Sequence, residues 1–168
     1  MRTFSLVLLA LLAAGCDSND LEMEFGDAIN ADGTGCLEGE LAVNTLEPNP
    51  SGQVLNSPFV VLDYAGFRRP LDSTPDAPFD FLFDEGTSVA FNLAGTVTGF
   101  REGILGNADI PPMRIGERRE ILIPPDLGYR FSGLRDRATG NFIRNTDGDI
   151  LVPQCGTLRF VVRLLDVQ

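Results

Sequence analysis

The sequence predicts an α+β domain in which an antiparallel sheet curls over one short helix. Three observations support this prediction. Short runs of β-branched and aromatic residues recur between prolines and glycines, as they do in small sheets. One segment, residues 98–105, has the composition of one or two helical turns. The chain has 168 residues, which is enough for one domain with a hydrophobic core.

The expected elements follow one another with turn-rich breaks between them. Extended segments are expected at residues 37–46, 58–67, 88–93, 118–123 and 157–167, with the helical segment before the fourth. Proline and glycine mark a turn at 47–53 and a loop at 68–78. In the last segment Leu158, Phe160, Val162 and Leu164 face one side, and Arg159 and Arg163 face the other. The segment 118–123 stops at Pro124-Pro125, and Tyr129 follows just after this break.

The charged residues are unusual and exclude several kinds of chemistry. There are 24 acidic and 13 basic residues, and the sequence contains no lysine, histidine or tryptophan. Without histidine there is no Ser-His-Asp triad or imidazole-bound zinc, and without lysine there is no Schiff base or P-loop. The acidic balance argues against nucleic-acid binding. The lack of lysine suits either a salty medium or a GC-rich coding sequence.

The amino terminus has the pattern of a secretion signal. One arginine precedes an apolar stretch at 4–12, which is too short to span a membrane, and small residues lead to Cys16. The ending LAAGC resembles the bacterial lipobox, so we expect cleavage before Cys16 and lipid attachment to it. The alternative is a plain signal peptide that happens to contain a cysteine. The resulting domains are a signal peptide at 1–15, an acidic flexible tether at 16–35 and a folded domain at 36–168.

With Cys16 used for lipidation, Cys36 and Cys155 remain. In an oxidising compartment we expect them to form a disulfide that joins the start of the domain to its last strand. Closing so long a loop stabilises the fold by about 4–5 kcal/mol in the chain-entropy model. Two independent free thiols are the alternative.

Five motifs occur in an order that resembles the FKBP-type peptidyl-prolyl isomerases. They extend over residues 60–167 and are LDYAG (62–66), FDFLFDEGTSVAFNL (79–93), TVTGFREGI (96–104), MRIGERREILIPPDLGY (113–129) and VPQCGTLRFVVRLLDV (152–167). The resemblance implies a five- to six-stranded antiparallel half-barrel wrapped around a short helix, with an apolar cleft between them.

The resemblance also implies roles for individual residues. Four would bind the proline ring: Phe79, Val97, Phe100 and Phe160. Tyr129 would donate a hydrogen bond to a substrate carbonyl, and Asp80 would orient the site through Tyr64 or act on the carbonyl electrostatically. Three further residues would line the cleft: Val89, Thr96 and Val152.

The implied reaction suits a chain without histidine or lysine. Rotation about an X-Pro bond has a barrier of about 18–20 kcal/mol because the planar amide loses resonance when it twists. No proton moves and no covalent bond breaks, so an apolar pocket that binds the twisted amide selectively is sufficient. No cofactor or metal is implied.

Simpler interpretations exist for several of these residues. The phenylalanines could be core residues, which is our interpretation of Phe91, while Tyr64 could be a packed strand residue and Asp80 a turn cap. Residues 145–149 (NTDGD) invite a calcium interpretation, but Asp-Gly is a common turn pair and we favour a turn.

The sequence also departs from the family pattern. The loop at 66–79 and the segment at 106–112 are longer than usual. Arg130 stands where a glycine is typical, Val89 replaces an aromatic residue, and residues 130–150 form an enlarged loop.

The sequence therefore predicts a monomeric envelope lipoprotein that isomerises X-Pro bonds of unfolded or exported polypeptides near the membrane. The principal alternative is a catalytically weak FKBP-like binding or chaperone module on the same anchor. A third is a structural lipoprotein that shares only the fold.

Overall fold

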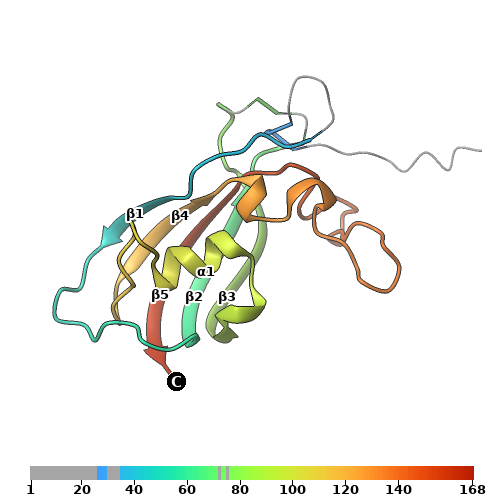
Figure 1. Cartoon of the computed structure of the whole chain (residues 1–168). Helices are drawn as coiled ribbons and strands as arrows, with labels where there is room; N and C mark the ends of the chain where they lie inside the picture. The colour runs from blue at the N-terminus through green and yellow to red at the C-terminus, as the bar shows by residue number, and fades with distance from the viewer. Residues whose placement is uncertain (1–25, 30–34, 72, 75) are drawn as a thin grey trace, which may run out of the picture.

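The structure of the chain is a computed structural model, and it describes residues 26–29, 35–71, 73, 74 and 76–168. Five antiparallel strands form one sheet in the order β1-β4-β5-β2-β3, and helix α1 lies across the concave face of the sheet (Figure 1). The elements are β1 (Ala42–Glu47), β2 (Phe59–Arg68), β3 (Phe81–Asn92), η1 (Leu93–Gly95), α1 (Thr98–Leu105), β4 (Arg118–Ile123), η2 (Pro125–Leu127), η3 (Arg130–Ser132) and β5 (Leu158–Val167). The predicted α+β fold class is confirmed.

The helix and the fourth strand coincide with the segments expected at 98–105 and 118–123. The first strand is shorter than expected and β3 is longer, because β3 begins at Phe81 rather than at Ser88. A bulge interrupts β3, where the register with β2 shifts and Ser88 has a φ of 52°. This irregularity hides the first half of the strand from a search for simple alternation.

Helix α1 approaches the sheet closely because glycines lie on its inner face. A Cβ added at Gly99 would be 2.5 Å from Cγ2 of Ile123, and one added at Gly103 would be 2.7 Å from Cγ2 of Ile121. Each glycine costs the helix about 1 kcal/mol relative to alanine. The close contact lets Phe100 and the fully buried Ile104 enter the core between helix and sheet.

The predicted two faces of the last strand are confirmed. The alternating residues of β5 that face the helix are buried, and they join the core cluster with residues of β2 and β4. On the opposite face Arg159 pairs with Glu120 at 2.5 Å, and Arg163 pairs with Glu47 at 2.6 Å. The central position of β5 in the sheet therefore gives it the largest share of the core.

The amino-terminal segment is attached to the domain. Cys36 and Cys155 form a disulfide, as predicted. The backbone amides of Gly26 and Ala28 donate to the carbonyls of Gln154 and Cys155 at 2.6 and 3.1 Å. Residues 26–29 fall within the predicted tether, and these hydrogen bonds attach them to the folded unit. The predicted signal peptide and Cys16 lie outside the described residues.

Two remaining expectations concern a turn and the membrane. Residues 146 and 147 form the turn predicted within 145–149, and a bridge between Arg144 and Ile150 closes it. In the described part of the chain, the structure has no helix that is both long enough and apolar enough to span a bilayer.

Candidate active site

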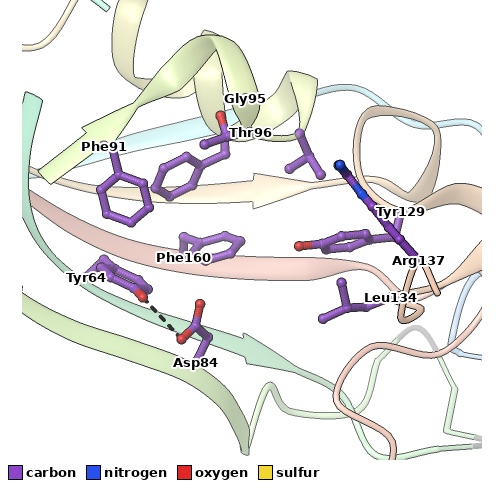
Figure 2. Close-up of a pocket in the computed structure, with 11 residues that line it drawn as sticks. Tyr64, Asp84, Phe91, Gly95, Thr96, Tyr129, Leu134, Arg137 and Phe160 are labelled. Carbon is purple, nitrogen blue, oxygen red and sulfur yellow. Dashed lines mark hydrogen bonds between the residues drawn. The ribbon is translucent and has the colours of Figure 1, made fainter. Parts of the chain in front are cut away.

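A cavity of about 410 Å³ opens between the start of α1, the concave face of β2, β3 and β5, and the loops that follow β4. Figure 2 shows the side chains around it. Its lining consists of Tyr64, Asp84, Phe91, Gly95, Thr96, Val97, Phe100, Tyr129, Leu134, Arg137 and Phe160. Strands, a helix and loops thus each contribute to one concave site.

The floor of the cavity is a chain of aromatic rings in edge-to-face or tilted contact. The ring centroids are 5.2 Å apart for Tyr64 and Phe91, 5.9 Å for Phe91 and Phe100, 4.8 Å for Phe100 and Phe160, and 5.5 Å for Phe160 and Phe83. Such contacts fix the ring orientations. The floor is therefore a rigid apolar surface that can accept a ring.

Gly66 on β2 makes room for this floor. A Cβ at this position would lie 2.6 Å from Cε1 of Phe160 and 2.9 Å from Cζ of Phe83. Any larger residue would push the Phe160 ring toward Phe100 or out of its contact with Phe83. The glycine in the LDYAG motif is thus required by the packing of the cavity floor.

Tyr64 and Asp84 form the polar pair of the cavity. The Tyr64 hydroxyl donates to Oδ1 of Asp84 at 3.1 Å, and Figure 2 marks this bond. The two residues lie on the neighbouring strands β2 and β3, where Asp84 pairs with Gly66 across the ladder. Burial, and next the negative charge of Asp84, raises the pKa of Tyr64 to about 12. Tyr64 therefore remains a neutral phenol and a hydrogen-bond donor.

Tyr129 enters the cavity from the loop after β4. Pro124 and Pro125 end the strand, η2 follows, and Tyr129 precedes η3 with a φ of −89°. Its hydroxyl has no hydrogen-bond partner among the described residues and points into the cavity in Figure 2. Burial, with a smaller contribution from Asp84, raises the pKa of Tyr129. The cavity thus contains a neutral, unengaged donor.

Arg130, which replaces the typical glycine of the family pattern, adopts a φ of 56°. This left-handed conformation is one that glycine reaches without strain and arginine does not. The Nε of Arg130 donates to the Asp126 carbonyl at 3.0 Å, and its own carbonyl accepts from the amide of Cys155 at 3.0 Å. These contacts hold the conformation that places Tyr129.

The structure brings together six of the residues named from the sequence. Tyr64, Thr96, Val97, Phe100, Tyr129 and Phe160 all line the cavity. Thr96 is fixed there by its hydroxyl, which donates to the carbonyl of Leu93 at 2.9 Å.

Four other residues named from the sequence do not line the cavity. Phe79 and Asp80 precede β3, where the Phe79 ring lies under the Arg69 guanidinium at 3.9 Å and Asp80 is exposed. Val89 pairs with Leu62 across the ladder. Val152 is buried in the core.

Instead of Phe79 and Asp80, the structure places Asp84 in the lining of the cavity and packs Phe83 against the Phe160 ring. The segment FDFLFDEG contains two Phe-Asp pairs, and only the second lies within β3 opposite the site strand β2. The signal that separates them is Gly86, which follows Asp84 by two residues and pairs with Tyr64.

Sequence reasoning also missed Phe91, Leu134 and Arg137. Phe91 was interpreted as core but contributes its ring to the cavity. Leu134 and Arg137 come from the enlarged loop at 130–150, for which the sequence offers no periodic pattern. The amide of Leu134 donates to the carbonyl of Val152 at 3.0 Å, which holds the loop over the site.

No group of three or more Cys, Asp or Glu side chains in the described ranges is placed to hold a metal ion. The polar groups that reach the cavity are hydroxyls, one carboxylate and one guanidinium. This set can hold a peptide by hydrogen bonds and charge.

The model of the family described as FKBP-type peptidyl-prolyl cis-trans isomerase matches residues 52–165. The chain belongs to this family. The matched range extends from before β2 into β5, of which it lacks the last two residues, and it includes all residues of the cavity.

Individual relatives are about one third identical to this chain over the segments that align. FK506-binding protein 2 of Dictyostelium discoideum is 37% identical over 38% of this chain and 44% of its own length. Peptidyl-prolyl cis-trans isomerase FKBP13, chloroplastic, of Arabidopsis thaliana is 32% identical over 52% of this chain and 38% of its own. A Corynebacterium glutamicum protein named "Probable FK506-binding protein" is 32% identical over 49% and 57%. The chain thus spans only about half the length of the curated relatives it matches.

Solved structures share the fold. The crystal structure of AtFKBP13 superposes with a TM-score of 0.53 and 22% identity, over 84% of this chain and 98% of that one. A peptidyl-prolyl cis-trans isomerase from Pseudomonas syringae pv. tomato superposes with a TM-score of 0.50 and 20% identity, over 75% and 74%. At these identities the likeness concerns the fold alone.

Proposed function

We propose that this protein is a peptidyl-prolyl cis-trans isomerase that acts on X-Pro bonds of unfolded or exported polypeptides. The observation that carries the proposal is the cavity itself, in which a rigid aromatic floor lies beside the unengaged hydroxyl of Tyr129. Family membership supports the same activity.

The mechanism requires selective binding of the twisted amide. The proline ring packs on Phe100 and Phe160, whose rings are fixed by their neighbours. The twisted amide has less charge separation than the planar one, so an apolar floor favours it. The hydroxyl of Tyr129 donates to a carbonyl of the bound peptide and holds the chain on one side of the rotating bond. Interactions made in the twisted state but not in the planar one lower the barrier.

The hydrogen-bonded pair of Tyr64 and Asp84 orients the aromatic floor of the cavity. Asp84 accepts from Tyr64, and the Tyr64 ring contacts Phe91 edge to face at 5.2 Å. The carboxylate also faces the region where the substrate amide turns. Loss of Asp84 therefore frees Tyr64 and removes a fixed negative charge from the cavity.

A prolyl exchange assay on short X-Pro peptides tests the proposal with a matched pair of variants. Asp84→Ala should lower kcat/KM by about tenfold or more, the cost of losing one positioning hydrogen bond at a reacting centre. Asp80→Ala removes the same charge four residues away and should leave kcat/KM within about twofold. Tyr129→Phe should lower kcat/KM while the protein remains folded. The isomerase proposal fails if the folded wild-type chain accelerates neither a peptide nor a proline-limited refolding reaction.

We also propose that the protein works at a bacterial cell envelope, anchored by lipid at Cys16. The lipobox-like ending of the signal supports the anchor, and the Cys36–Cys155 disulfide supports an oxidising compartment. Cells fed a labelled fatty acid should incorporate label into the wild-type chain and not into Cys16→Ala. Equal labelling of both chains would remove the anchor from the proposal.

One observation favours a second function, a binding module with weak catalysis. Leu134 and Arg137 of the enlarged loop line the same cavity, so a bound segment has contacts beyond those to the aromatic floor. Binding of a Pro-containing peptide, followed by NMR, with no increase in its cis/trans exchange rate would favour the binding module over the isomerase.

A further inference from the structure

We infer that Arg137 makes the site selective for proline-containing peptides with an acidic side chain next to the proline. The inference rests on the proposed function, because it assigns a specificity to the same cavity. Arg137 differs from the other arginines of the enlarged loop, Arg130, Arg135 and Arg144, in its contacts.

Those other arginines are engaged within the protein. Arg130 donates to the Asp126 carbonyl at 3.0 Å. Arg135 donates to the carbonyls of Ser132 and Gly140 at 2.7 and 3.0 Å, and it lies over the Phe142 ring at 3.7 Å. Arg144 donates to the Gly148 carbonyl at 2.8 Å. Each of these guanidinium groups therefore supports the shape of the loop.

Arg137 lines the cavity, and its guanidinium has no hydrogen-bond or ion-pair partner within the described ranges. The preceding acid, Asp136, is occupied by its own turn, where Oδ1 accepts from the amides of Ala138 and Thr139 at 3.0 and 2.8 Å. Asp84 accepts from Tyr64, and it lies on the other side of the cavity from the guanidinium of Arg137 in Figure 2. The cavity thus contains an unneutralised cation that is exposed at its edge.

The position of this cation fits a residue that flanks the proline. A proline ring on Phe100 and Phe160 occupies the floor, and consecutive Cα atoms are about 3.8 Å apart. The neighbouring side chains must therefore lie near the rim, where the enlarged loop passes over the site. A guanidinium binds a carboxylate through two parallel hydrogen bonds, a geometry that other side chains do not offer equally well.

The negative charge of the whole protein acts on an acidic peptide in the opposite direction to Arg137. With a formal net charge of −11, the chain repels acidic peptides at long range. A simple comparison of Glu and Lys peptides would therefore mix the general field with the local contact. The ratio of rates for Glu and Gln peptides, compared between wild type and an Arg137 variant, cancels the general field.

The experiment measures kcat/KM of the full chain on peptides that carry Glu or Gln before the proline, and on a second pair with the change after it. In wild type at low salt, one of the two Glu/Gln ratios should exceed that of Arg137→Gln by about three- to fivefold, the effect of one rim ion pair. Added salt should reduce the difference. Arg118→Gln removes one exposed positive charge outside both the cavity and the enlarged loop, and should keep the wild-type ratios.

Each other outcome is decisive. If both Glu/Gln ratios are the same in wild type and Arg137→Gln while the peptides are turned over, the specificity is wrong and the isomerase proposal stands. If Arg137→Gln slows all peptides equally, Arg137 contacts the peptide backbone and the inference also fails. If no peptide is turned over, the same ratios of dissociation constants are measured by NMR titration. A Glu preference that depends on Arg137 then upholds the specificity for a binding module, and its absence overturns it.

Discussion

Two loops are each held by one buried arginine. Arg119 holds the loop at 106–117, which lies apart from the cavity lining, and Arg68 holds the loop at 124–157, which covers the cavity. Arg119 and Arg68 are both only 2% exposed. Arg119 ties the first loop to the carboxyl end of α1, and neither Arg119 nor the residues it bonds to line the cavity. Arg68 ties the second loop, which covers the cavity, to the end of β2.

The bonding of the two arginines explains the difference. Arg119 donates to Oε1 of Glu117 at 2.6 Å and to the carbonyls of Gly103, Pro111 and Pro112 at 3.0, 2.8 and 3.2 Å. Arg68 donates to the carbonyls of Leu151 and Ile150 at 2.9 and 2.7 Å, and it stacks on Phe81 at 3.7 Å. The contacts of Arg119 include a buried ion pair, which matters for stability. The contacts of Arg68 fix the loop that carries Leu134 and Arg137. A buried arginine that bonds to loop carbonyls thus contributes mainly to stability in one loop and to the geometry of the site in the other.

The largest effect is expected from Arg119→Met. The substitution keeps the approximate length of the side chain but leaves the buried carboxylate of Glu117 without its ion-pair partner, which costs about 3–5 kcal/mol of unfolding free energy. Chemical denaturation measures the change. Arg118→Met is the matched control, because Arg118 forms an exposed pair with Glu47 at 3.1 Å and its loss costs less than about 1 kcal/mol. Equal costs for the two variants would contradict the assigned role of Arg119.

Arg68→Met should have a smaller effect on stability and a larger one on the site. It removes charged hydrogen bonds to the carbonyls of Leu151, Arg69 and Ile150, at a cost of about 2–3 kcal/mol. Hydrogen exchange should accelerate at residues 134–152 and remain unchanged at 106–113, and kcat/KM should fall. Arg119→Met should show the reverse pattern, with exchange accelerated at 106–113. Acceleration in both loops with either variant would mean that the loops are coupled and the comparison is wrong.

The sequence predicted the elements that have a regular pattern of apolar residues or that match a family motif. The helix at 98–105 and the strand at 118–123 were recognisable because glycines, apolar spacing and the two prolines mark their limits. Most of the cavity floor followed from the same motifs.

The features that could not be predicted from the sequence depend on strand register and on loop packing. The choice between Asp80 and Asp84 requires knowing which residue of β3 lies opposite Gly66, and a bulge removes the alternation that would reveal it. Arg137 reaches the cavity only because Arg68 and the carbonyl of Val152 fix its loop, and these contacts join residues far apart in the chain.

The smallest predicted effect distinguishes two turns within the loop that covers the cavity. Backbone and side-chain hydrogen bonds from Thr139, and next the amide of Ala138, lower the pKa of Asp136. Because the folded state favours the carboxylate, the stability that this turn gains is complete above the ordinary carboxyl range and is lost as the pH falls through the lowered pKa. The second turn has a neutral cap, since Oδ1 of Asn145 accepts from the amides of Asp147 and Asp149 at 3.0 and 2.8 Å.

Amide exchange followed by NMR as the pH is lowered from about 7 to about 2 tests this difference between the two turns. After correction for the intrinsic pH dependence of exchange, the Thr139 amide should lose protection while that of Asp147 keeps it. Asp136→Asn should make the protection of Thr139 independent of pH, because an amide oxygen caps the turn without titrating. Loss of protection at both turns together would show that the whole loop opens at low pH. The pH response would then not be local to the cap at Asp136, and the predicted difference between the two turns would be wrong.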